Sequence, residues 1–176
     1  MSGAHGIPVV SVVGKSDAGK TTLLEGVVAE LVARGYAVAT CKHHAHEVDL
    51  DVAGKDSWRH ARAGARMVMV SSPAQFVVMR RVERELTLDE IAAEAARVGC
   101  DILLTEGFKR SARVRIEVVR RARSRELISD PSEIVALVTD DEGIEAPGVP
   151  RFALDDHRGV ADFVEREFLR GARHGD

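Results

Sequence analysis

One segment constrains this chain more than any other: Gly14-Lys15-Ser16-Asp17-Ala18-Gly19-Lys20-Thr21. It fits the phosphate-binding pattern G-x-x-x-x-G-K-[ST] at every fixed position. An apolar run precedes it at residues 9–13, and an amphipathic run follows it at residues 21–34. A strand that enters a glycine-rich loop and leaves it as a helix suits phosphate binding, because loop N–H groups and the helix N-terminus both attract the anion. The segment therefore predicts a site for a nucleoside triphosphate.

The last residues of the motif carry its chemistry. Lys20 would place a full positive charge against the β- and γ-phosphates, and the hydroxyl of Thr21 can ligate Mg²⁺. Lys15 stands five residues before Lys20. At this spacing some dimeric P-loop ATPases use a lysine to reach their partner's phosphates, and a solvated lysine is the alternative. The predicted nucleotide-binding residues in this region are Gly14, Lys15, Ser16, Asp17, Ala18, Gly19, Lys20, Thr21 and Thr22.

A carboxylate follows another apolar strand, which we expect at residues 101–105. Glu106 stands where P-loop proteins carry an acidic residue on the Mg²⁺ side of the phosphates. It can hold a metal-bound water or orient an attacking water, and the alternative is a solvated residue at a strand end. The predicted catalytic residues are therefore Lys20 and Glu106, and the predicted metal ligands are Thr21, Asp51 and Glu106.

Polar residues also follow the second expected strand. Three histidines, His43, His44 and His46, stand close together there. They can contact phosphate or a polar substrate, ligate zinc, or belong to a polar loop, and the sequence leaves these alternatives open because no clear fourth metal ligand accompanies them. Farther on, either Asp51 or Asp56 can face the metal in a nucleotide-sensing loop. Asp56 is equally suited to cap a helix. We count His43, His44, His46, Lys55 and Asp56 as candidate substrate or partner contacts.

Eight basic residues and a single acidic one lie from position 109 to position 125. Lys109, the first of them, is a further candidate substrate or partner contact. The stretch is either a charged edge strand that resists aggregation or a landing site for a polyanionic ligand or partner. Interleaved aromatic residues are missing from it, which disfavours single-stranded nucleic acid. Beyond it, Asp140 follows an apolar strand and can accept hydrogen bonds from guanine N1–H and N2–H₂, or it can simply form a turn.

Apolar runs alternate with segments of helical periodicity along the chain. We expect strands at residues 7–13, 37–41, 66–70, 75–79, 101–105, 113–119 and 134–138, with 113–119 half-exposed. We expect helices at residues 21–34, 56–63, 87–98 and 157–169. Such a pattern predicts an α/β, P-loop NTPase-like fold of three layers with a mostly parallel sheet. Ligands bind outside the carboxyl ends of such strands, where all of these motifs fall.

Composition narrows the class of protein further. A chain of 176 residues suits one domain, here residues 1–176, and a net charge of −3 gives no general attraction to nucleic acid or to anionic membranes. We expect no membrane span, because no apolar run approaches about 18 residues. The 2 cysteines and the lack of a recognisable signal peptide predict a cytoplasmic protein.

Taken in order, these segments resemble the MobB family of molybdopterin guanine dinucleotide biosynthesis proteins. The resemblance covers residues 7–141, and residues 142–176 add a closing strand and helix. Its most specific part is the histidine-rich turn followed by Gly-Lys-Asp-Ser and then by Glu-Gly-Phe-Lys. The segments that carry it are residues 14–22, 42–46, Asp51, 54–58, 63–65, 101–109, 116–118 and 136–140.

The resemblance implies a cytoplasmic, homodimeric protein that binds GTP with Mg²⁺ and hydrolyses it slowly. It also implies an adapter for the molybdenum cofactor guanylyltransferase, the enzyme that attaches GMP to the cofactor, with the molybdopterin cofactor itself as a further candidate ligand. By this likeness Lys20 and Thr21 take phosphate and Mg²⁺, Glu106 lies near the γ-phosphate, and residues 43–57 respond to nucleotide or contact the cofactor. The arginine-rich stretch after Lys109 departs from the family, so partner contacts there stay open.

Other functions fit the same motif. A small-molecule kinase could use the arginines of residues 110–125 as a lid over the phosphates, and a metallochaperone GTPase could deliver metal from the histidines. A binding module controlled by nucleotide differs from a slow GTPase by rate alone. Intrinsic hydrolysis without an arginine finger is on the order of 10⁻³ s⁻¹.

Overall fold

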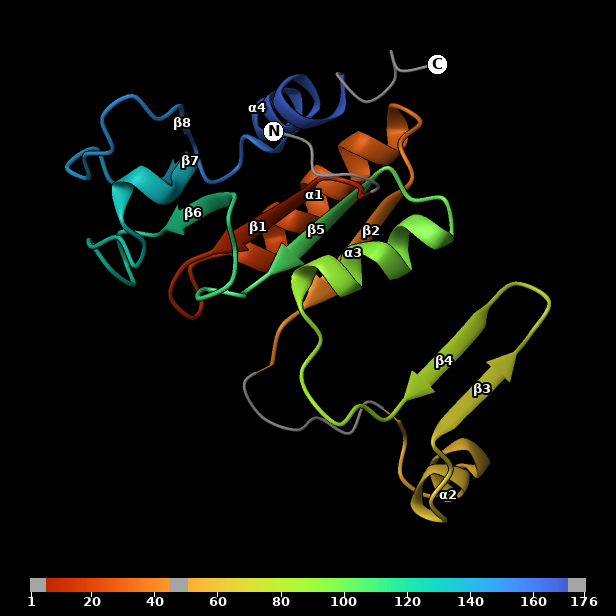
Figure 1. Ribbon diagram of the computed structural model, residues 1–176. Helices are drawn as coiled ribbons and strands as arrows, with labels where there is room; N and C mark the ends of the chain where they lie inside the picture. Colours follow the sequence, from red (N-terminus) through yellow and green to blue (C-terminus); the bar gives the residue numbers. More distant parts are fainter. Residues whose placement is uncertain (1–5, 45–50, 171–176) are drawn as a thin grey trace. The chain divides into compact units, whose positions relative to one another are not determined.

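The computed structural model describes residues 6–44 and 51–170, which fall into two compact units (Figure 1). The first unit combines the chain up to His43 with the chain from Thr87 onward. The second unit comprises residues 44–86. The phosphate-loop motif, Glu106 and Asp140 all belong to the first unit.

Six parallel strands form the sheet of the first unit, in the order β2-β5-β1-β6-β7-β8. Their bounds are β1 Val9–Val13, β2 Val38–Lys42, β5 Ile102–Glu106, β6 Arg115–Val119, β7 Ile134–Thr139 and β8 Arg151–Phe152. Val12 of β1 lies opposite Glu106 on one side and Ile116 on the other. Because neighbouring strands all run the same way, their carboxyl ends meet at one edge of the sheet. The phosphate-loop motif after β1, His43 after β2, Glu106 at the end of β5 and Asp140 after β7 therefore lie at this edge.

Helices cover both faces of this sheet (Figure 1). They are α1 Lys20–Ala33, α3 Leu88–Arg97 and α4 His157–Val164, the last continuing as a π-helical turn at Glu165–Leu169. Side chains alternate along β1, so Val10 and Val12 join the large core with α1 and α4, whereas Val9 packs in a second cluster with Leu88 of α3. The three layers confirm the predicted fold class. Within the described residues, no helix is long and apolar enough to cross a membrane.

β6 lies inside the sheet, between β1 and β7, and all of its residues are buried. The prediction of a half-exposed strand at residues 113–119 is therefore wrong, and so is the charged edge strand offered for its arginines. The polar positions in the strand are charges with partners inside the protein, although the buried Nε of Arg115 has no hydrogen-bond partner within the described residues. Arg115 pairs with Glu133, and Glu117 accepts two backbone hydrogen bonds from the loop that follows. A buried charge is tolerated when it is paired or hydrogen-bonded, so the alternation of polar and apolar residues along β6 did not mean that one face is exposed to solvent.

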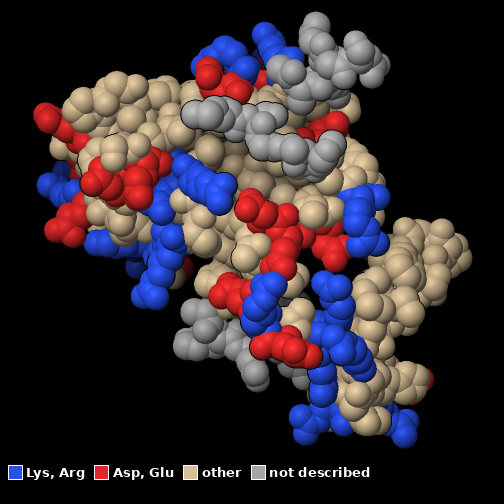
Figure 2. Space-filling model, in the orientation of Figure 1, with Lys and Arg blue, Asp and Glu red and all other residues tan. Residues whose placement is uncertain are grey.

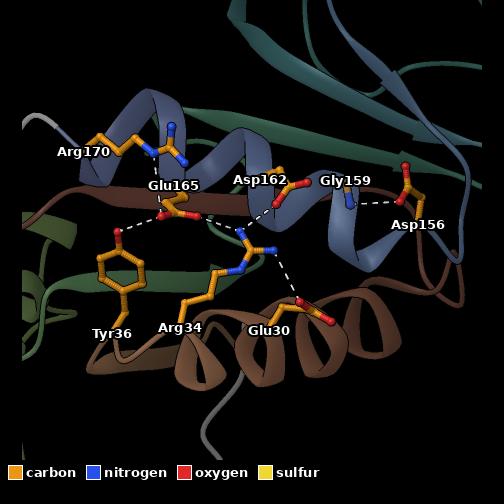
Figure 3. Close-up of polar contacts among 8 residues, drawn as sticks. All are labelled: Glu30, Arg34, Tyr36, Asp156, Gly159, Asp162, Glu165 and Arg170. Carbon is orange, nitrogen blue, oxygen red and sulfur yellow. Dashed lines mark hydrogen bonds and ion pairs between the residues drawn. The ribbon is translucent and has the colours of Figure 1, made fainter.

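A network of polar side chains joins the end of α1 to α4 and the turn after it (Figure 3). Arg34 Nη1 lies 2.8 Å from a carboxylate oxygen of Glu165 and 2.8 Å from one of Asp162, and Nη2 lies 3.4 Å from Glu30. The hydroxyl of Tyr36 donates to Glu165 at 3.2 Å. The hydrogen bond from Arg34 lowers the pKa of Glu165, and the same bond raises the pKa of Arg34. The network therefore fixes the carboxyl end of α1.

The second unit contains one helix and a hairpin: α2 Asp56–Arg62, β3 Met67–Ser71 and β4 Phe76–Arg80. The two strands were expected to belong to the mostly parallel sheet, and this is wrong, because they pair antiparallel in a sheet of their own. Only residues 72–75 connect them, which is too short for the crossover that a parallel pair requires. Several apolar side chains of the hairpin are exposed, including Met69 and Phe76.

Candidate functional site

The predicted phosphate-binding motif forms the loop between β1 and α1. Gly14 and Gly19 have φ angles of +148° and +101°, where residues with a side chain are strained. A Cβ atom at Gly14 would also lie 2.3 Å from the backbone oxygen of Val118 in β6. Gly19 is the N-cap of α1 and has no side chain to accept hydrogen bonds from the first turn, Lys20-Thr21-Thr22, which carries no acidic residue. The loop therefore presents backbone donors and the positive end of a helix dipole to an anion.

Lys20 folds back over this loop, with Nζ donating to the backbone oxygen of Lys15 at 2.8 Å. Partial burial lowers the pKa of Lys20, the charge of Glu106 opposes that shift, and the charges of Lys109 and Lys42 add to it. The pKa of a lysine falls in this way when its positive charge is incompletely compensated. Phosphate oxygens would supply the missing negative charge.

Glu106 stands at the end of β5, and its side chain is 13% exposed. One carboxylate oxygen accepts a hydrogen bond from Thr21 Oγ1 at 2.8 Å, and the other lies 3.3 Å from Nζ of Lys42. A hydroxyl and a carboxylate side by side are oxygen ligands of the kind that Mg²⁺ prefers. The structure thus brings together Lys20, Thr21 and Glu106, three residues that the sequence placed in the site.

His43 and Phe108 contact each other just beyond the carboxyl ends of β2 and β5. The centroids of their rings lie 4.8 Å apart, and the backbone N–H of His43 donates to the backbone oxygen of Glu106 at 2.9 Å. A Cβ atom at Gly107 would stand 3.1 Å from the Cβ of His43, so a glycine is needed where these strands end. Phe108 is buried with a φ of +55°, a strained conformation for an aromatic residue. The packing of its ring against Leu88 and Ala112 offsets this strain and keeps the segment after Glu106 turned into the fold.

The tip of the loop contacts the segment after β6. Nζ of Lys15 lies 3.4 Å from Glu126, and the carboxylate of Asp17 lies 3.9 Å from Arg123. Ser16 and Thr22 are exposed and Ala18 is buried. Directly after β7, Oδ1 of Asp140 accepts a hydrogen bond from the backbone N–H of Arg121 at 2.6 Å.

The remaining predicted contacts fall elsewhere. His44, Asp51, Lys55 and Asp56 belong to the second unit, where Lys55 is the N-cap of α2 and Asp56 lies 3.7 Å from Arg59 in an exposed pair. His46 lies outside the described residues. Within residues 6–44 and 51–170, no group of three or more His, Cys, Asp or Glu side chains is arranged to hold a metal ion.

Basic and acidic side chains are interspersed on the face shown in Figure 2. Within the basic stretch, Arg113 lies 3.7 Å from Asp89 and Arg125 lies 3.5 Å from Asp141. The two acidic partners therefore offset part of the positive charge that the sequence concentrates between positions 109 and 125.

Sequence reasoning missed three residues that shape the site: Phe108, Glu117 and Arg120. Glu117 was visible as the single acid in the basic stretch, and Arg120 as the first residue after the strand. Arg120 meets the loop because β6 lies beside β1, and Phe108 meets His43 because β5 lies beside β2. Neither of these neighbour relations can be found from spacing along the chain.

A model of the family described as molybdopterin guanine dinucleotide synthesis protein B, MobB, matches residues 9–140. The chain belongs to the MobB family. It is 34% identical over 171 residues to the molybdopterin-guanine dinucleotide biosynthesis adapter protein of Haemophilus influenzae, covering 95% of this chain and 94% of the relative. The Escherichia coli protein of the same name is 33% identical over 172 residues, with 93% and 95% covered.

The solved structure of Bacillus subtilis MobB superposes on this chain with a TM-score of 0.76 at 25% identity, covering 93% of this chain and 99% of that one. A MobB homologue from Bacillus stearothermophilus gives a TM-score of 0.66 at 26% identity, with 91% and 97% covered. The resemblance found in the sequence is thus confirmed at the level of family and fold.

Proposed function

We propose that this MobB-family protein is a GTP-binding adapter in molybdopterin guanine dinucleotide biosynthesis, with a slow GTPase activity. One observation carries the nucleotide site: the motif loop, Lys20, Thr21 and Glu106 converge at the carboxyl edge of β1 and β5. The names of the Haemophilus and Escherichia relatives support the adapter role. An adapter acts with a partner enzyme, which we propose is the molybdenum cofactor guanylyltransferase, and we propose that it does so as a cytoplasmic homodimer.

The residues present fit a magnesium nucleotide. Thr21 and Glu106 would hold Mg²⁺, which when bound supplies positive charge beside the β- and γ-phosphates. Lys20 and the loop N–H groups bind the phosphates and neutralise the charge that develops on the γ-phosphoryl oxygens. Glu106 also orients water through its carboxylate. Asp51 remains a proposed Mg²⁺ ligand.

Guanine preference is assigned to Asp140. A carboxylate at the end of β7 can accept from both N1–H and N2–H₂ of guanine and repels the acceptor edge of adenine. The bond from the backbone N–H of Arg121 to Oδ1 fixes the direction of this carboxylate. Asp140→Asn would therefore reduce the preference for GTP over ATP.

Calorimetric titration with non-hydrolysable GTP and ATP analogues, with and without Mg²⁺, tests the proposal. We expect Mg²⁺-dependent preference for the guanine nucleotide, no detectable binding by Lys20→Ala, and binding but slower hydrolysis by Glu106→Gln. Arg158→Ala, which removes an exposed positive charge from α4, is the matched control and should bind like the wild type. Equal loss of binding in Lys20→Ala and Glu106→Gln would contradict the assigned roles, and a preference for ATP would contradict the choice of base.

A further inference from the structure

Arg120, the first residue after β6, reaches back to the phosphate loop. Its Nε donates to the backbone oxygen of Ala18 at 3.4 Å. Its Nη2 lies 3.1 Å from the position that a Cβ atom on Gly19 would occupy. The guanidinium group therefore covers the Ala18–Gly19 peptide from the side of its carbonyl oxygen.

That peptide group links the contact to phosphate binding. A trans peptide is planar, and its C=O and N–H point in opposite directions. A contact that fixes the oxygen of Ala18 therefore also fixes the N–H of Gly19, which points away from Arg120. Backbone N–H groups of such a loop are the donors that hold the phosphates. Arg120 is placed to act on an anion through the backbone, without touching it.

The segment that carries Arg120 is itself held at both ends. At its start, the backbone N–H of Arg121 donates to Asp140 at 2.6 Å. At its end, the N–H groups of Ile128 and Ser129 donate to the fully buried Glu117 at 2.5 and 3.0 Å. A side chain on a fixed backbone gives up less freedom when it makes a contact, so its partner is held more firmly. The contact to Ala18 is thus supported by the sheet itself.

We propose that Arg120 is a positioning residue for the nucleotide phosphates, which holds the Ala18–Gly19 peptide with its N–H directed at the bound anion. The inference rests on the proposed nucleotide site. Because Arg120 acts on the phosphate cradle, its loss should weaken GTP and ATP analogues, and also GDP, by a similar factor. The preference between guanine and adenine should stay unchanged.

Calorimetry with GDP and a non-hydrolysable GTP analogue in Mg²⁺ provides the test. Arg120→Ala should raise both dissociation constants about tenfold, because the Ala18–Gly19 peptide is then no longer held in the free protein and must be ordered on binding. Arg120→Lys should recover part of the affinity, because an ammonium group can donate to the same carbonyl. Arg158→Ala serves as the control for lost charge.

Thermal unfolding without nucleotide shows whether each variant is folded. Should Arg120→Ala fail to fold, Arg120→Met keeps the aliphatic stem, cannot donate, and should show the same loss of affinity. Wild-type affinity in folded Arg120→Ala or Arg120→Met, or slower hydrolysis at saturation with unchanged affinity, overturns the inference. If the wild type binds, Lys20→Ala does not and Arg120→Ala binds normally, only the inference fails. If the wild type itself does not bind, the proposed function fails with it.

Discussion

The two ends of α1 are built in opposite ways. At the amino end, Gly19 leaves the first N–H groups without a side-chain cap, and Lys20 has a lowered pKa in partly buried surroundings. At the carboxyl end, Arg34 is surrounded by carboxylates, and Gly35 closes the helix with its N–H donating to Val32 at 2.9 Å (Figure 3). One end keeps its polar groups available to a ligand, whereas the other satisfies them within the protein. A single helix thus carries binding at one end and stability at the other.

The same substitution in the loop that leads into α1 and just after the carboxyl end of α1 should separate these roles with the largest effect. Gly14→Ala puts a Cβ atom 2.3 Å from the backbone oxygen of Val118 at a φ of +148°, so we expect a loss of about 3 kcal/mol in the free energy of unfolding and no nucleotide binding. Gly35 has a φ of +86°, and a Cβ atom added there would have no atom within 4 Å apart from those of Gly35 itself and its two chain neighbours. Gly35→Ala should cost only the left-handed conformation, about 1 kcal/mol, and leave binding intact.

Urea unfolding and calorimetric titration of both variants provide the measurement. Equal destabilisation by the two substitutions would show that backbone conformation alone sets their cost. It would also show that β6 does not crowd the phosphate loop. Normal nucleotide binding by Gly14→Ala would contradict the site.

Midway between these ends, Gly26 of α1 faces His157 of α4. A Cβ atom on Gly26 would lie 2.2 Å from Nδ1 and 2.7 Å from Cβ of that histidine. Although alanine favours a helix over glycine by about 1 kcal/mol, Gly26→Ala should destabilise the protein by about 2 kcal/mol, because overpacking dominates. The double variant Gly26→Ala/His157→Ala should be more stable than Gly26→Ala alone, which a double-mutant cycle in urea measures. If the free-energy changes of the two single substitutions are additive, α1 and α4 move apart to accommodate the added methyl group, and the contact with His157 is not the cause of the destabilisation.

The sequence was sufficient for the elements whose signal is local. The glycine and lysine positions of the motif fixed the loop, and Thr87 with Glu90 marked the start of α3, where the capping box is present. Continuous apolar runs located β1, β5 and β7 to within two residues at either end. In each case the physical cause lies within a few residues of the effect.

Where the cause lay in a distant partner, the sequence misled. β6 was predicted to be half-exposed because charged residues such as Arg115 and Glu117 alternate with apolar ones, although the partners of these two charges lie 18 and 11 residues further along the chain. Arg120 could not be placed on the loop, because Ala18 is 102 residues away and meets it only through the pairing of β1 with β6. The convergence of Lys20, Thr21 and Glu106 was therefore predictable from the motifs, and the residues that support them were not.

The smallest effect we predict concerns the carboxyl end of α1. Because the hydrogen bond from Arg34 lowers the pKa of Glu165 below its ordinary value of 4.5, the charged carboxylate contributes stability above that pH. The contribution should disappear as the pH falls through the lowered pKa of the folded state. Glu165→Gln keeps the shape and lacks the charge, so it should melt slightly below the wild type at neutral pH and together with it in acid. Glu25→Gln, which removes an exposed carboxylate from α1, is the control. If the difference in melting temperature between Glu165→Gln and the wild type persists undiminished into acid, the network stabilises the protein through the shape of the side chain and not through its charge. The two ends of α1 would then differ less in their electrostatics than the contacts of Arg34 indicate.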